Sequence, residues 1–552
     1  FKSTDEGTTW EPISPDLTRD DPDKQELSGP ITSEGPWAEI YCTIYSFAES
    51  PSKPGLLWAG TDDGLIHVSL DGGQKWTNVT PNDLPEWTMI STIEPSIHDP
   101  AKAYVAATRY KLDDNRPMIY KTTDYGATWE LIVSGIEDGD FTRVVREDPE
   151  QPDLIYAGTE TGVYFSTDDG YRWQPIQLNL PIVPIYDISV KNDDLIVATH
   201  GRSFWILDDL SPLRQSSASG LTGDTRLFKP RTTIRMMKQA GSIVETGAGN
   251  HYTSDLLGAP AAWIENKPVD GEPTKTGLTS GMNPPDGVAI DFILENDNKE
   301  DLVIEILNSS KDVIRQLFPV SKDAYTVKIR NGLNRIYWDL MYNTSFELPD
   351  EAGGESPFAA KTMAPLAAPG TYSVRLKIGE TVHIDSFQIL KDPRSDTSQE
   401  EFNAQLDLQL QIQDKYEEVR DCVLQIRSVK EQVSEWGNRY RDNHTAISIA
   451  ANSILGQLSE VENKIVPYKS SGPQPRGIPV GLYAKIKELM GIVACADWPP
   501  TKSSYELLDD LSNRLEIQFA ILQNVIDQEL PSLIKLLDKK MYPWFQHDPT
   551  ST

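Results

Sequence analysis

One short pattern occurs four times in the chain and constrains its fold more than any other feature. The copies read STDEGTTW from Ser3, SLDGGQKW from Ser69, TTDYGATW from Thr122 and STDDGYRW from Ser166. All four fit Ser/Thr-x-Asp-x-Gly-x-x-Trp, and we call each of them a box. A repeat of roughly 40 to 50 residues with strand-like sequence between the copies is typical of the blades of a β-propeller.

The residue types of the box indicate a structural role. The aspartate can accept hydrogen bonds from backbone amides across a tight turn, the glycine tolerates a left-handed backbone, and the tryptophan can cover the hairpin with its ring. We therefore expect these aspartates to hold turns rather than to react. The residues concerned are Asp5, Asp71, Asp124 and Asp168 with Trp10, Trp76, Trp129 and Trp173.

The boxes and the strands beside them resemble a known family. With WAGTDDGLIHVSLDGG, YVAATRYKLDD, YAGTETGVYFS and ATHGRSFWILDDL, the chain is similar to bacterial Asp-box (BNR) repeat proteins labelled glycosyl hydrolase or sortilin-like. The resemblance runs along nearly the whole chain. It implies that this is the C-terminal portion of a propeller protein, with further N-terminal blades or a partner chain completing the propeller.

Propeller connectivity predicts where a ligand would bind. The box hairpins lie at one end of each sheet, so the loops between the second and third strands, and the starts of the innermost strands, share the opposite end. Candidate ligand-binding residues there are Trp37, Tyr41, Trp87, Arg109, Tyr110, Arg143, Glu160, Tyr186, His200 and Arg202. Arginine pairs with carboxylates, and aromatic faces stack on sugars or apolar side chains.

Two chemistries remain open at this end of the sheets. Glycoside hydrolysis needs two carboxylates facing each other, and Glu39, Asp62, Asp63 and Asp140 are candidates besides Glu160. A sialidase-like site would use an arginine triad with a tyrosine and a glutamate, which Arg109, Arg143 and Arg202 with Tyr41 and Glu39 could supply. The Arg-Ile-Pro signature of sialidases is absent from the sequence. The alternative is a binding surface without catalysis.

Downstream, the pattern changes twice. We expect blades over residues 1–210, a linker and irregular segment over 211–284, an immunoglobulin-like β-sandwich over 285–392, and an antiparallel helical bundle over 393–548. Short alternating strands such as VAIDFIL and GTYSVRL predict the sandwich. A capping box at Ser398 and Glu401, followed by apolar residues at threes and fours, predicts the first long helix.

Composition excludes some partners. The net charge is −32, which gives no positive field to attract a nucleic acid. No apolar run is long enough to span a membrane, and the three scattered cysteines form no metal motif. We expect no metal and no cofactor. The sequence indicates a secreted, periplasmic or cell-surface protein that binds a glycan or peptide. Glycoside hydrolysis and a structural role in a surface assembly are the alternatives.

Overall fold

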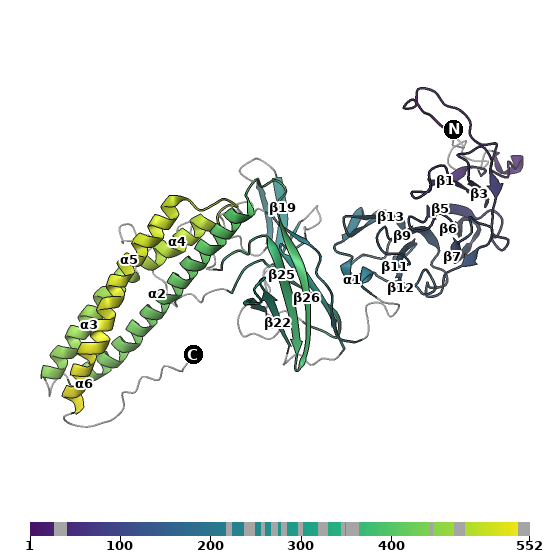
Figure 1. Cartoon of the computed structure of the whole chain (residues 1–552). Coiled ribbons are helices and arrows are strands. Elements are labelled where there is room, and N and C mark those ends of the chain that lie inside the picture. Colours follow the sequence, from purple (N-terminus) through teal and green to yellow (C-terminus); the bar gives the residue numbers. More distant parts are fainter. Residues whose placement is uncertain are drawn as a thin grey trace.

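The structure is a computed structural model of the chain. It describes residues 1–26, 41–216, 224–236, 249–254, 260–266, 274–277, 284–295, 302–317, 329–343, 348, 364–440, 445–467 and 481–538. Figure 1 shows small β-sheets at one end, a larger β region in the middle and a helical region at the other end. The expected class, mainly β with a C-terminal helical region, is confirmed.

Four small antiparallel sheets follow one another along the N-terminal part. Sheet 1 contains β1 (Ile44–Glu49), β2 (Leu57–Thr61), β3 (Ile66–Ser69) and β4 (Thr77–Asn78). Sheet 2 contains β5 (Met89–Pro95), β6 (Ala103–Arg109), β7 (Asp114–Thr122) and β8 (Glu130–Leu131). Sheet 3 contains β9 (Thr142–Glu147), β10 (Ile155–Thr159), β11 (Val163–Ser166) and β12 (Gln174–Pro175). Sheet 4 contains β13 (Ile185–Lys191), β14 (Asp194–Thr199) and β15 (Phe204–Leu207).

Successive sheets pack face to face. The second strand of each of the first three sheets carries a large residue that is fully buried, namely Trp58, Tyr104 and Tyr156. Small residues on the same strands admit the neighbouring sheet: a Cβ at Gly60 would lie 2.4 Å from the Cγ2 of Ile90 in sheet 2. Burial on both faces explains why these strands read as continuous apolar runs instead of alternating ones.

The strand register separates two ends of each sheet. In sheet 2, Ala103 pairs with Thr122, where the box begins, whereas Arg109 pairs with Asp114. Six residue steps of β-strand separate the two pairs, which corresponds to about 20 Å. We call the box end of the sheets the rear and the Arg109 end the front.

The middle region contains three further sheets. One holds β16 (Arg226–Leu227), β21 (Val288–Leu294) and β24 (Gly332–Trp338). A second holds β17 (Thr233–Arg235), β26 (Thr381–Lys391), β25 (Gly370–Ile378), β22 (Leu302–Leu307) and β23 (Val313–Leu317). A third holds β18 (Gly249–Ser254), β19 (Pro260–Asn266) and β20 (Thr274–Gly277). The first two sheets share one core, which includes Ile290, Trp338, Ile304 and Val374.

The structure differs from the sequence expectation over 211–284. This segment, expected to be a linker without regular structure, contains α1 (Ser211–Arg214) and β16 to β20. Strand β16 pairs with β21, and β17 runs parallel to β26. Strands β16 and β17 contain only two and three residues, which is too short for a periodic pattern in the sequence. They form strands because they pair with β21 and β26.

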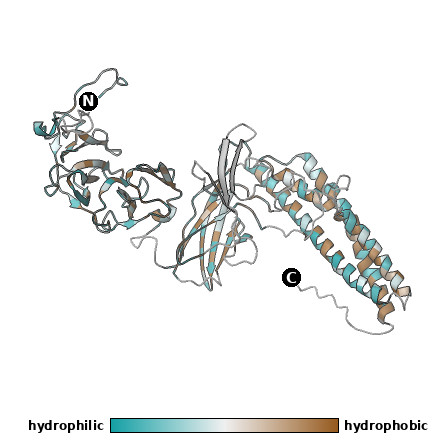
Figure 2. Cartoon of the chain, turned by 180° about the vertical axis from the view of Figure 1, so that it is seen from behind, coloured by the Kyte–Doolittle hydropathy of each residue, from teal (hydrophilic) through white to brown (hydrophobic). Residues whose placement is uncertain are grey.

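The helical region contains α2 (Gln399–Arg439), α3 (Thr445–Ile465), α4 (Leu482–Ala494), α5 (Lys502–Asn524) and α6 (Leu530–Asp538). The capping box is present: the Ser398 side chain accepts from the Glu401 amide, and the Glu401 side chain accepts from the Ser398 amide. Hydrophobic and hydrophilic residues share each helix in Figure 2, and the buried ones form one core. Ahead of Pro531 the chain passes through a π-helical turn, Val525–Glu529, and then continues as α6, which accommodates the missing proline N–H.

Arg235 joins the middle region to the helices. Its side chain is 2% exposed and donates to Asp497 Oδ1 at 2.6 Å, to Gln405 Oε1 at 3.0 Å and to the Ala367 carbonyl at 2.8 Å. Asp497 follows α4 and Gln405 lies on α2, so one guanidinium fixes both helices to the β region. Within the described residues, no helix has the length and apolarity needed to cross a membrane.

Candidate functional site

The boxes form closed turns at the rear. In the second sheet, Asp124 Oδ1 accepts from the Thr128 amide at 2.8 Å and from the Thr122 hydroxyl at 2.8 Å. The Thr128 hydroxyl donates to Oδ2 at 2.7 Å, and these bonds, led by that of Thr128, lower the pKa of Asp124. A carboxylate whose oxygens are both occupied by its own turn has a structural role.

A cluster around Arg143 occupies the front of sheets 2, 3 and 4. The Arg143 guanidinium carbon lies 4.5 Å from the ring centre of Tyr186, 4.9 Å from that of Phe141 and 5.3 Å from that of Tyr110. Its Nε and Nη2 donate to Glu160 Oε2 at 2.8 and 2.6 Å. Cation–π contacts with three rings and an ion pair hold this arginine in a defined position. We call these five residues the Arg143 cluster.

The Arg143 cluster is accessible at its rim. The Arg143 side chain is 11% exposed, whereas that of Glu160 is 35% exposed and the Tyr186 residue is 48% exposed. His200 extends the rim by stacking on Tyr186, with ring centres 4.9 Å apart. The ordered core of the cluster therefore presents an aromatic ring and a carboxylate to solvent.

A second group lies at the front of sheets 1 and 2. Trp87 contacts Tyr41 edge to face at 5.4 Å, and the charged ends of Arg19 and Lys24 each lie 5.6 Å from the Trp87 ring centre. Trp87 has a φ of 62°, a left-handed conformation that is strained for a bulky side chain. Lys111 lies 6.0 Å from the Tyr41 ring. Aromatic rings and cations thus gather here too.

Three predicted carboxylates accept hydrogen bonds from protein groups at the front of the sheets. Asp63 accepts from the Thr61 hydroxyl at 2.5 Å and from the Arg19 amide at 2.7 Å. Asp140 accepts from Thr159, Thr161 and Tyr164. Asp62 Oδ1 accepts from the Thr43 amide at 2.8 Å, and burial raises the pKa of Asp62. Asp63 and Asp140 each accept from the hydroxyl of the threonine that ends the second strand of its sheet, Thr61 or Thr159, so both carboxylates brace the turn that follows.

The remaining predicted residues are distributed as follows. Arg109 donates to the Glu86 carbonyl at 3.1 Å and pairs with Asp114, so it adjoins the Trp87 group. Arg202 is exposed and donates to the Gly201 carbonyl. No contact joins Arg109, Arg143 and Arg202 into a triad among the described residues. Trp37 and Glu39 lie outside the described residues. Sequence reasoning missed Phe141, although its place between Asp140 and β9 was a usable signal.

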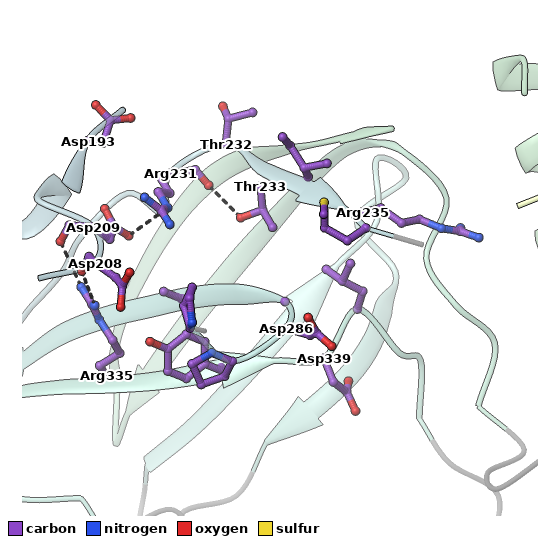
Figure 3. Close-up of a pocket in the computed structure, with 18 of the residues that line it drawn as sticks. Asp193, Asp208, Asp209, Arg231, Thr232, Thr233, Arg235, Asp286, Arg335 and Asp339 are labelled. Carbon is purple, nitrogen blue, oxygen red and sulfur yellow. Dashed lines mark hydrogen bonds and ion pairs between the residues drawn. The ribbon is translucent and has the colours of Figure 1, made fainter. Parts of the chain in front are cut away.

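A cavity of about 560 Å³ lies between sheet 4 and the middle region (Figure 3). Arg335 closes one side by pairing with Asp291 at 2.8 Å and donating to the carbonyls of Asp208 and Asp209 at 2.8 and 3.2 Å. Arg231 pairs with Asp194 at 2.9 Å. Because Arg231 and Arg335 are paired with carboxylates, we assign this cavity to the junction between sheet 4 and the middle region. Within the described part of the chain, no three potential ligand side chains gather to hold a metal ion.

The fold and site define a mainly β protein with a C-terminal helical region and an aromatic–arginine surface on its small sheets. No protein-family model matches the chain, and no curated protein matches it. Among solved structures it is similar to a GH74 xyloglucanase from Xanthomonas campestris, at 16% identity and a TM-score of 0.25 over 45% of this chain and 42% of the enzyme. It is also similar to YCF48 from Cyanidioschyzon merolae, at 15% identity and a TM-score of 0.24 over 62% of this chain and 84% of that protein. The match thus spans less than half of the xyloglucanase, and scores at this level carry no functional argument.

Proposed function

We propose that the chain is part of a bacterial Asp-box β-propeller protein of the sortilin-like kind, which binds a peptide or glycan outside the cytoplasm. The four small sheets are its blades, the middle region is an immunoglobulin-like sandwich, and the helices form a bundle. The repeated antiparallel sheet followed by a box hairpin supports the propeller. Two sheets around a common core support the sandwich.

The Arg143 cluster is the observation that carries the binding function. Three rings from three segments surround one guanidinium, which orders the side chains before a ligand arrives. A preordered site loses little conformational entropy on binding. The exposed rim offers the Tyr186 ring for stacking and Glu160 for hydrogen bonds, which suits a sugar ring or a peptide side chain with a polar neighbour.

Binding is favoured over hydrolysis by the state of the carboxylates. Asp62, Asp63 and Asp140 accept hydrogen bonds from neighbouring amide and hydroxyl groups, and Glu160 is paired with Arg143. A glycosidase needs one carboxyl group free to donate a proton and a second free to act as base or nucleophile. We therefore propose no hydrolytic mechanism for the described front.

A glycan and peptide array tests the proposal with the whole chain. We expect a bound ligand whose affinity falls about 5-fold in Tyr186→Ala, because a lost stacking contact is worth about 1 kcal/mol. Tyr171→Ala is the matched control: this tyrosine is 62% exposed and also contacts a cation, Lys121, but it lies within the rear box of sheet 3. Equal affinity in Tyr186→Ala, Arg143→Gln and the unmodified chain would refute the assignment. Release of reducing ends from a bound glycan would favour hydrolysis instead.

A further inference from the structure

The boxes do more than close their own hairpins, because each of the last three interlocks with the preceding repeat. The tryptophan indole N–H always donates to the backbone carbonyl of the residue three positions after the preceding box tryptophan. These bonds are Trp76 to Ile13 at 2.8 Å, Trp129 to Val79 at 2.6 Å and Trp173 to Ile132 at 2.8 Å. The acceptor residue is β-branched in every case.

The box glycine makes room for the same residue. A Cβ at Gly73 would lie 2.9 Å from the Cβ of Ile13, and one at Gly126 would lie 2.8 Å from the Cβ of Val79. One at Gly170 would lie 2.4 Å from Ile132 Cδ1. The box glycine and tryptophan therefore form a socket, and the β-branched residue with its carbonyl forms a plug.

The first box has the same socket without a plug among the described residues. The Trp10 indole donates to the carbonyl of Gly7 in its own turn at 3.0 Å. A Cβ at Gly7 would meet only Trp10 within 4 Å. Trp10 is 62% exposed, whereas the equivalent Trp173 is 2% exposed. The socket chemistry is complete, and the position that the plug takes elsewhere is open.

Strand β1, the first strand of sheet 1, is also uncovered on the face that points away from sheet 2. Phe47 pairs with Ala59, at the register where Thr92 pairs with Ala106 and Val145 with Ala157. Thr92 and Val145 are 8% and 0% exposed, but Phe47 is 57% exposed. Two independent features, a hydrogen-bonding socket and an apolar strand face, thus lack the neighbour that their equivalents have.

We propose that the Gly7–Trp10 socket and Phe47 form a docking surface for a further box-bearing sheet, whose plug is a valine or isoleucine three residues after its box tryptophan. The three occupied sockets define this partner chemistry. A second copy of the chain does not fit, because its free plug would be Ile176, which packs into the core containing Leu210 and Leu213. Leu210 stands where the next box would have its glycine, so that end of the array is closed. This inference is independent of the proposed ligand site.

The chain's own repeat provides the probe. A copy of residues 76–120 is joined to Lys2. The copy carries β5, β6 and most of β7, and it is followed by Lys2 and Ser3 in place of Lys121 and Thr122. The copied Val79 is then the plug for Gly7 and Trp10. Hydroxyl-radical footprinting read by mass spectrometry reports on individual side chains, and Tyr171 serves as an unaffected internal reference.

We expect the modification rates of Trp10 and Phe47 to fall several-fold in the extended chain, with Tyr171 unchanged. The same extension with Val79→Asp in the copy should leave Trp10 reactive. A second extension, residues 129–164 joined to Lys2, supplies Ile132 as the plug and covers failure of the first graft to fold. Undiminished reactivity of Trp10 and Phe47 in both extensions overturns the proposal. Protection that appears in the unextended chain as its concentration rises also overturns it, since the occupant would then be a second copy.

Discussion

The Arg235 junction gives a prediction whose size follows from burial. The Arg235 and Asp497 side chains are 2% and 7% exposed, and their atoms approach to 2.6 Å. Arg235→Met keeps most of the side-chain volume but leaves the Asp497 carboxylate buried without its cation. Removing one partner of a buried ion pair costs about 3–5 kcal/mol. We therefore expect the helical region to lose about that much free energy of unfolding.

Far-ultraviolet circular dichroism during urea unfolding measures this change, because α2 to α6 supply the helical signal. Asp497→Asn in the same chain should restore a large part of the loss, since the uncompensated charge is then gone. Arg514→Met is the control: its pair with Asp510 lies on α5 with side chains 47% and 58% exposed, and such pairs contribute about 0.5 kcal/mol. A loss below about 1 kcal/mol in Arg235→Met, or no rescue by Asp497→Asn, would show that the junction does not stabilise the helices.

Two further predictions concern the small sheets. Burial, opposed by Arg146, raises the pKa of Glu94 from 4.5 to about 7. Because the folded state then holds the proton more tightly than the unfolded state, the contribution of Glu94 to stability falls as the pH rises from 4.5 to 7. Glu94→Gln should gain roughly 2–3 kcal/mol relative to the unmodified chain at pH 8 and almost nothing near pH 4, and a pH-independent difference in urea midpoint would contradict this. Gly126→Ala should cost about 2–4 kcal/mol, because it combines a left-handed φ of 85° with the contact to Val79. Gly7→Ala, at the same φ but without a plug, should cost only about 1–2 kcal/mol in the same assay, and equal losses would argue against the socket.

Local chemistry made some elements predictable from sequence. The four boxes stand out because residue types within eight positions make their own hydrogen bonds, as Asp124 does with Thr128. The start of α2 was predictable for the same reason, since Ser398 and Glu401 satisfy each other's backbone amides. Each of these signals lies within a single turn of chain.

Contacts between distant residues were not predictable in this way. Propeller connectivity placed Arg143, Tyr110 and Tyr186 at the same end of the sheets, but the sequence did not show that both rings would pack on the Arg143 guanidinium. Arg235 was not singled out, because its partner Asp497 lies 262 residues away. Nothing in the residues beside Arg235 distinguishes it from an exposed arginine. Such side chains acquire their role only when the fold brings separate segments together.

The two ends of the small sheets differ in a way that separates assembly from recognition. At the rear, residues 50–56, 96–102 and 148–154 connect the first two strands of sheets 1, 2 and 3 with seven residues each. The plug also stays three residues after the box tryptophan throughout. Beyond the plugs, residues 80–88 and 133–141 lead to the front and into β5 and β9, but the equivalent stretch before β1 runs from residue 14 to residue 43. A rear interlock with fixed spacing holds neighbouring sheets in register whatever the front loops contain. Length and composition are therefore free to vary at the front, which is where a scaffold of repeated sheets can acquire a ligand site without losing its packing.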